Sequence, residues 1–159
     1  SEEPDGYPVT TPPPVGSTHG FRVWVLGDPG MANRQQRAVR DAFRAFAVDH
    51  PPAMVLLLGD NAYMRGTDRQ YQRALFDIYS ATLRRVPVWA TFGNHDAFSA
   101  NSDEQSGVYY AVFSFPTRGQ AGGAPSGSEA YYAFAYGHVH FLRLDSQGTD
   151  RSPHGDIIT

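Results

Sequence analysis

The sequence predicts an α/β fold in which three parallel strands alternate with two helices in the order βαβαβ. Three observations lead to this prediction. Short apolar runs recur about one strand-helix unit apart, a helical pattern of apolar residues follows each of the first two, and a glycine with a polar residue ends each run. Strands that alternate with helices of this length imply right-handed crossovers and a parallel sheet. Such a sheet binds its ligands outside the carboxyl ends of its strands.

The three strands are expected at residues 21–27, 53–58 and 86–92. The first run shows an alternating pattern and is rich in β-branched and aromatic side chains, which is typical of a strand. The second is a continuous apolar run of the kind found in a strand that is covered on both faces. The loops after these strands are therefore where we expect the chemistry.

The two helices are expected to pack on this sheet. The first runs from about residue 34 to 48, with Asn33 as its N-cap and three apolar residues at spacings of four and three on one face. Those residues are Val39, Phe43 and Phe46. The second runs from about residue 68 to 82, and its apolar face consists of Tyr71, Leu75, Ile78 and Tyr79.

The second half of the chain does not continue this alternation of strands and helices. An aromatic stretch covers residues 109–115, and residues 118–128 are rich in Gly, Ser and Pro, which is typical of a mobile loop that could lie over a site. Residues 131–136 and 139–144 read as two strands that turn at Gly137. We expect them to form an antiparallel hairpin added to the sheet.

The composition is that of one globular domain. The chain has 159 residues, of which 41% are hydrophobic and 18% charged, and this excludes a disordered chain. The net charge of −3 is scattered, so neither nucleic acid nor a membrane surface is an expected partner. No apolar run approaches the roughly 20 residues that span a bilayer. Because cysteine is absent, any metal must be held by oxygen and nitrogen ligands.

Oxygen ligands follow each of the three predicted strands. Residues 28, 60 and 94 are Asp, Asp and Asn, each directly after a glycine, at intervals of 32 and 34 residues. Neighbouring parallel strands lie about 4.8 Å apart, so equivalent residues at their ends can converge on a pair of cations. One such aspartate alone is more often a turn or capping residue, but three loops in order favour a metal site. The glycines would let the backbone turn sharply and approach the metals closely.

The three loops resemble those of the calcineurin-like metallophosphoesterases, and among them the purple acid phosphatases. The matching motifs are Gly27-Asp28-Pro29-Gly30, Gly59-Asp60-Asn61-Ala62-Tyr63 and Gly93-Asn94-His95-Asp96. The resemblance implies that Asp28 and Tyr63 bind one metal, that Asp60 bridges both, and that Asn94 binds the second. It also implies that His95 stands beside the substrate as general acid and that Asp96 orients it. The phenolate of Tyr63 would suit trivalent iron, since it is a hard, anionic oxygen donor.

This resemblance implies the βαβαβ start of a metallophosphoesterase α/β sandwich and the hydrolysis of a small-molecule phosphate monoester at a dinuclear centre. The metals would be iron with a second iron, zinc or manganese. Two alternatives stay open: a phosphodiesterase or nucleotidase of the same superfamily, and a non-catalytic binding module that has lost the metal site. The resemblance favours an extracellular or periplasmic location, on which the sequence itself is silent.

Residues 21–159 are interpreted as the N-terminal part of this domain, and residues 1–20, which are Pro-rich, as a linker that follows an absent fibronectin-like domain. The family completes its site with three histidines from later loops. Gly137-His138-Val139-His140 matches one such motif, but it falls at the hairpin turn and comes too soon after His95. We therefore expect the missing C-terminal half to be a partner of this chain, and the isolated chain to bind metal weakly and be inactive.

Overall fold

The structure is a computed structural model that describes residues 11–148, 150 and 152. Most of the tail that follows the predicted hairpin, and the first ten residues of the predicted linker, lie outside the described residues. Within the described part, no helix is long and apolar enough to cross a membrane.

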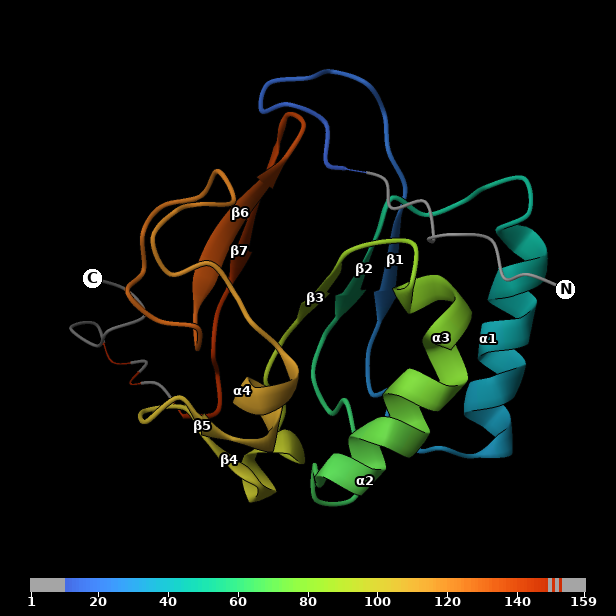
Figure 1. Cartoon of the computed structure of the whole chain (residues 1–159), viewed down its shortest axis with the longest axis vertical. Helices are drawn as coiled ribbons and strands as arrows, with labels where there is room; N and C mark the ends of the chain where they lie inside the picture. Colours follow the sequence, from blue (N-terminus) through green and yellow to red (C-terminus); the bar gives the residue numbers. More distant parts are fainter. Residues whose placement is uncertain (1–10, 149, 151, 153–159) are drawn as a thin grey trace, which may run out of the picture.

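A three-stranded parallel sheet forms the centre of the molecule (Figure 1). Its strands are β1 (Val23–Leu26), β2 (Met54–Leu57) and β3 (Val88–Ala90), in the order β1-β2-β3. Both pairings are parallel, so the predicted βαβαβ start of an α/β fold is confirmed. All three strands end at the same edge of the sheet, which is the lower edge in Figure 1.

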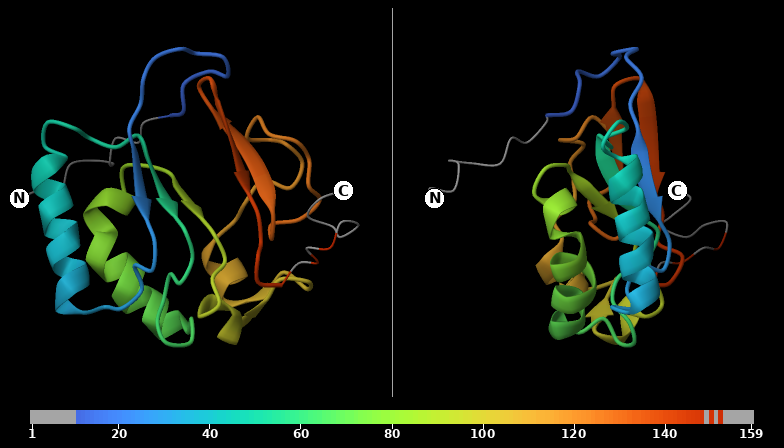
Figure 2. Two further views of the ribbon diagram at one scale, coloured as in Figure 1. Left: turned by 180° about the vertical axis from the view of Figure 1, so that it is seen from behind. Right: turned by 90° about the vertical axis from the view of Figure 1, so that its right-hand side faces the viewer.

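Helices lie against one face of this sheet (Figure 2). Helix α1 (Arg34–Phe46) follows β1, and the side chain of Asn33 caps it by accepting a hydrogen bond from the backbone N–H of Gln36 at 2.9 Å. The second predicted helix is continuous from α2 (Asp68–Tyr71) to α3 (Asp77–Leu83), with a π-helical turn between them. Its predicted apolar face is confirmed, because all four of its members are buried.

The apolar face predicted for α1 is only partly correct. Phe43 does pack on the sheet, since its ring stacks on that of Trp24 with 3.6 Å between centroids. Val39 and Phe46 are instead more than half exposed, at 54% and 58%. Within the described residues the sheet has three strands, and α1 lies beside its outer strand, β1, so one ring of α1 reaches the sheet and the flanking positions face solvent.

A short irregular region follows β3. It contains the 3-10 turn η2 (Asp96–Phe98), the paired strands β4 (Ala100–Asn101) and β5 (Ser106–Gly107), and helix α4 (Val108–Val112). Tyr109 of α4 is fully buried, and its hydroxyl donates a hydrogen bond to the carbonyl of Ala90 at 2.9 Å. The predicted aromatic stretch is therefore a core element that holds this region against the end of β3.

The predicted hairpin is present as β6 (Tyr132–Tyr136) and β7 (Val139–Arg143), which turn at Gly137 with φ +59°. It forms a two-stranded sheet of its own in the described part of the chain. Side chains join it to β3: the hydroxyl of Tyr132 donates to the carbonyl of Ala90 at 2.9 Å, and the rings of Trp89 and Phe134 stack at 3.8 Å. The carbonyl of Ala90 thus accepts hydrogen bonds from the hydroxyls of Tyr109 and Tyr132, in place of one from the backbone of a neighbouring strand.

The Gly/Ser/Pro-rich loop at residues 118–128 packs along this hairpin. The backbone N–H of Ala135 donates to the carbonyl of Ala121 at 2.9 Å, and Gly122 forms a bridge with Phe134. The loop therefore covers β6 and does not lie over the carboxyl ends of β1, β2 and β3.

Candidate metal centre

The loops after β1 and β2 bring two aspartates to the carboxyl edge of the sheet in the same backbone conformation. Asp28 has φ 51° and Asp60 has φ 54°, both in the left-handed region that residues other than glycine rarely adopt. Asp28 is exposed, whereas Asp60 is buried. Strained backbone of this kind is frequent at functional sites, because the surrounding structure must hold it in place.

The hydroxyl of Tyr63 connects the two carboxylates. It lies 2.9 Å from Oδ1 of Asp28 and 2.8 Å from Oδ2 of Asp60, to which it donates. Burial and the two carboxylates, with Asp60 the stronger of them, raise the pKa of Tyr63 well above its ordinary value. Three oxygen atoms from two loops therefore meet, and the phenol stays protonated in the metal-free chain.

The loop after β3 places His95 beside this cluster. Its backbone N–H donates to Oδ1 of Asp60 at 2.9 Å, and its ring lies 4.4 Å from the ring of Tyr63 between centroids. Ring atom Nδ1 lies 2.7 Å from the carbonyl oxygen of Met64. Because a carbonyl only accepts, this contact holds the proton on Nδ1 and leaves Nε2 to take or release one. Asn94, directly before His95, is exposed at the same edge.

Asp96 lies behind the cluster and is fully buried. Its carboxylate accepts hydrogen bonds from the hydroxyl of Tyr71 at 2.5 Å, from the amide side chain of Asn61 at 2.9 Å and from the backbone N–H of Gly93 at 2.9 Å. The resemblance implies that Asp96 orients His95, but the ring of His95 contacts the carbonyl of Met64 and not this carboxylate. Burial raises the pKa of Asp96, and the hydrogen bonds it accepts oppose this shift. Asp96 therefore ties the loop after β2 to the loop after β3.

Two members of this network were not among the residues predicted for the site. Tyr71 reads in the sequence as one of four apolar positions on a helix, and only its hydroxyl distinguishes it from a core residue. Asn61 directly follows Asp60, and its position inside a strand-end motif was the one available signal. The side chains of both residues donate hydrogen bonds to Asp96, and these bonds hold the loop after β3 in place.

Gly93 is required by close packing at this edge. A Cβ atom there would lie 2.2 Å from the backbone nitrogen of Asp60 and 2.3 Å from its Oδ1. Gly59 has φ +101°, a conformation that favours glycine. At Gly27 a Cβ would meet nothing within 4 Å, so the close approach predicted for that glycine is absent.

We therefore expect Gly93→Ala to push Asp60 away from Tyr63 and to lower the free energy of unfolding by roughly 1–3 kcal/mol or more, the usual cost of overpacking. Thermal unfolding checks this, with Gly27→Ala as the matched control because its added methyl group has open space. Equal melting temperatures for the two variants would contradict the close approach.

Residues 21–156, most of the chain, match the family model for calcineurin-like phosphoesterase. The chain belongs to this family. Comparisons with curated proteins and with solved structures gave no significant match. The calcineurin-like phosphoesterases are hydrolases that cleave phosphoesters and typically bind divalent metals, and these general properties extend to this chain.

The donor set of this phosphoesterase fits a hard metal ion. Carboxylate and phenol oxygens are hard ligands, and here they are already held within hydrogen-bond distance of one another. Among the described residues, no three His, Cys, Asp or Glu side chains group closely enough to hold a metal. A metal would therefore depend on Tyr63, and on Asn94 at the neighbouring strand end, in addition to Asp28 and Asp60.

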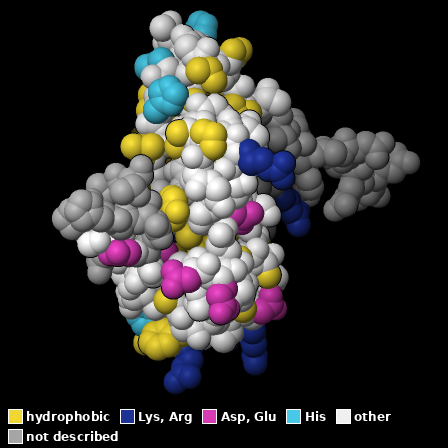
Figure 3. Space-filling model, turned by 90° about the vertical axis from the view of Figure 1, so that its left-hand side faces the viewer, with side chains coloured by type: hydrophobic (Ala, Val, Ile, Leu, Met, Phe, Trp, Pro, Cys, Tyr) yellow, Lys and Arg dark blue, Asp and Glu magenta, His cyan; other side chains and the backbone are white. Residues whose placement is uncertain are grey.

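The two histidines of the hairpin turn lie at the other end of the phosphoesterase. His138 and His140 are exposed, and Nδ1 of His138 contacts the carbonyl of Ser17 at 3.0 Å. In Figure 3 most of the visible histidine side chains are at the upper end, whereas the acidic side chains lie toward the lower half. The turn between β6 and β7 lies at the upper end of Figure 1, whereas β1, β2 and β3 end at the lower edge, so the fold separates the histidines of this turn from the carboxylate cluster.

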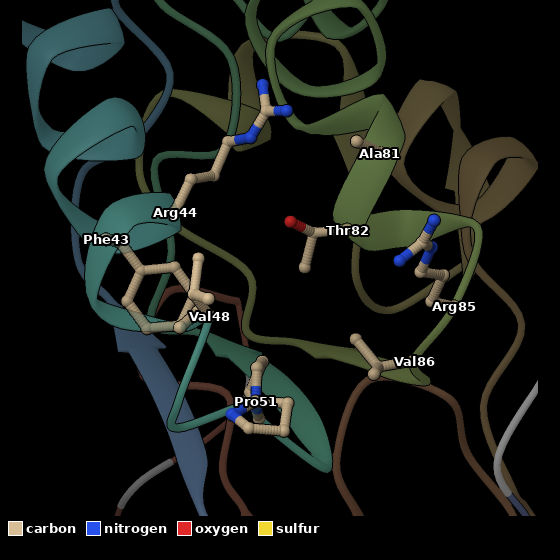
Figure 4. A pocket seen from close by; sticks show the side chains of 10 residues that line it. Phe43, Arg44, Val48, Pro51, Ala81, Thr82, Arg85 and Val86 are labelled. Atoms are coloured by element: carbon tan, nitrogen blue, oxygen red, sulfur yellow. The ribbon is translucent and has the colours of Figure 1, made fainter.

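A pocket of about 450 Å³ also lies away from the cluster, between the C-terminal ends of α1 and α3. Its walls are apolar, and Arg44, Thr82 and Arg85 are its polar side chains (Figure 4). No carboxylate or imidazole lines it. It therefore offers no metal ligands.

Proposed function

We propose that this phosphoesterase hydrolyses phosphate monoesters at a dinuclear metal centre of the purple acid phosphatase type. The observation that carries the proposal is the hydroxyl of Tyr63, which contacts both Asp28 and Asp60. A phenol placed between two carboxylates is a suitable ligand for trivalent iron, because the charge of the ion would drive off the phenol proton. Asp28 and Tyr63 would bind the first metal, Asp60 would bridge, and Asn94 would bind the second.

The residues of the chain have separate tasks in this reaction. When bound, the metal ions would polarise the phosphoryl group and activate a water molecule. His95 would protonate the leaving alkoxide from Nε2, while the carbonyl of Met64 holds Nδ1 and fixes the ring. Asp96 would keep the loops in register through Asn61 and Gly93.

Substrate class tests the proposal directly. The full-length protein, supplied with iron and with zinc or manganese, is expected to hydrolyse an aryl phosphate monoester faster than the corresponding diester. A faster rate on the diester would favour the phosphodiesterase alternative. No hydrolysis and no bound metal in the natively isolated protein would favour a binding module.

Tyr63→Phe tests the metal assignment without measuring activity. A phenolate bound to trivalent iron absorbs visible light by charge transfer, so the iron-loaded protein is expected to be coloured and the variant colourless. The variant keeps the aromatic ring and its contact with His95. Absorption spectra of both proteins at matched iron content check this, with Tyr131→Phe, on a half-buried tyrosine of the hairpin region, as control. A colour that survives in Tyr63→Phe would exclude Tyr63 as a ligand.

A further inference from the structure

Three buried hydrogen-bond donors on the sheet and hairpin have no acceptor in the described chain. They are Nε1 of Trp89 and the Nε and Nη1 atoms of Arg143. Arg143 is only 6% exposed, and its one hydrogen bond to another described residue is a long contact of 3.5 Å from Nη2 to the hydroxyl of Tyr109. The rings of Tyr109 and Tyr132 lie 5.9 Å from the guanidinium carbon. Both rings face the cation, but they accept no hydrogen bond from its Nε or Nη1 atoms.

A buried cation without a counterion is costly, because its desolvation is not repaid by an ion pair. Cation–π contacts offset only about 0.5–2 kcal/mol of such a cost. Arg143 forms no ion pair within the described residues. The arrangement therefore calls for an anionic acceptor from outside the described chain.

The space for such an acceptor lies next to these donors. A pocket of about 90 Å³ between β2, β3 and the hairpin is lined by Trp89 and Arg143 together. That volume is several times the roughly 10–15 Å³ that a single water molecule needs, so the pocket has room for a small carboxylate. Of the described residues that line it, Arg143 alone is charged. A second pocket of about 380 Å³, next to the hairpin, shares Arg143 and Leu142 with the first.

Large apolar side chains surround these pockets on the surface. Leu58, Leu142 and Leu144 are 58%, 76% and 54% exposed, and each lines one or both pockets. Val25, which is 50% exposed, pairs in register with Leu56 of the first pocket. An inorganic anion would leave this apolar surface in water, whereas a polypeptide can cover it and supply the acceptor together.

We propose that the surface formed by Leu58, Trp89, Leu142, Arg143 and Leu144 binds a polypeptide segment that carries an Asp or Glu between large apolar residues. Its carboxylate enters the 90 Å³ pocket and accepts hydrogen bonds from Nε and Nη1 of Arg143. A second oxygen of the segment accepts from Nε1 of Trp89. Its apolar side chains cover the exposed leucines.

The experiment uses two blocked tripeptides, acetyl-Leu-Glu-Leu-amide and acetyl-Leu-Gln-Leu-amide, titrated into the full-length protein. The chain has two tryptophans, so ¹H–¹⁵N spectra show two indole N–H signals, and Trp89→Phe identifies the one that belongs to Trp89. We expect the Glu peptide to shift that signal and to bind at least tenfold more tightly than the Gln peptide. Acetate and inorganic phosphate at equal ionic strength are expected to shift it far less.

Two variants separate the charge from the apolar surface. Arg143→Met removes an unpaired buried cation, so we expect a melting temperature no lower than that of the parent and equal affinity for both peptides. Leu142→Ser changes an exposed position, so we expect the fold to stay intact and the affinity for the Glu peptide to fall severalfold. Arg118→Met, an exposed arginine elsewhere, is the control.

The proposal is overturned if the Glu and Gln peptides bind equally well, or if neither moves the signal of Trp89. It is also overturned if acetate or phosphate binds as tightly as the Glu peptide, since the site would then take a small anion. None of these outcomes depends on hydrolysis, so the test is independent of the proposed function.

Discussion

Asp60→Asn is expected to abolish metal binding and, with it, phosphoester hydrolysis. The loss of metal affinity should exceed the 10- to 100-fold typical of residues that only support a ligand, because Asp60 is the buried carboxylate at the middle of the cluster. The substitution removes one negative charge and almost no volume. The amide can still accept from the backbone N–H of His95 and meet the hydroxyl of Tyr63, so we expect stability to change by less than about 1 kcal/mol.

Metal content by mass spectrometry and the rate on an aryl phosphate together check this prediction. Asp103→Asn is the matched control, since it makes the same change at an exposed position between β4 and β5. If the variant keeps both its metal and its rate, Asp60 is not a ligand of the metal centre. A variant that unfolds would instead show that the carboxylate is needed for the fold, which the melting curve reveals.

The site could be predicted from the sequence to the extent that it depends on strand ends. Parallel strands of similar length place their following residues at one edge, so the spacing of Asp28, Asp60 and Asn94 was enough to bring the loops together. Gly93 was also identified, because a close approach of backbones demands a residue without Cβ. The link through the hydroxyl of Tyr63 needed the three-dimensional loop, although the tyrosine itself had been singled out.

The remaining features depend on contacts between segments that the sequence does not pair. The two exposed apolar residues of α1 have a helical pattern that indicates burial, but burial also requires a sheet wide enough to receive them. The hairpin was predicted from its own residues, whereas its attachment through Tyr132 and Tyr109 to one carbonyl of β3 was not. Likewise, an arginine in a strand gives no sign that two of its guanidinium nitrogens find no acceptor among the described residues.

Asp96→Ala is expected to cause the largest loss of stability of the variants considered. It leaves the hydroxyl of Tyr71, the side-chain N–H of Asn61 and the backbone N–H of Gly93 without their acceptor, all in a buried place. Breaking a buried charged network of this kind costs roughly 3–5 kcal/mol. For a chain of this size, that corresponds to a fall in melting temperature of about 6–20 °C.

Asp96→Asn separates support of the loops from a direct part in catalysis. Its oxygen can serve Asn61 and Gly93, and its NH₂ group can donate to Tyr71 once that hydroxyl turns, so the network survives without the charge. We expect a smaller stability loss of about 1–2 kcal/mol, typical of one impaired hydrogen bond to a charged group, and hydrolysis within tenfold of the parent well below the melting temperature. In Tyr71→Phe, which removes the opposing hydroxyl alone, a similar stability loss is expected. If Asp96→Asn instead kept its melting temperature and lost hydrolysis a hundredfold or more, the charge of Asp96 would act on the reaction, as the sequence motif implies, and its bonds to the loops would be secondary.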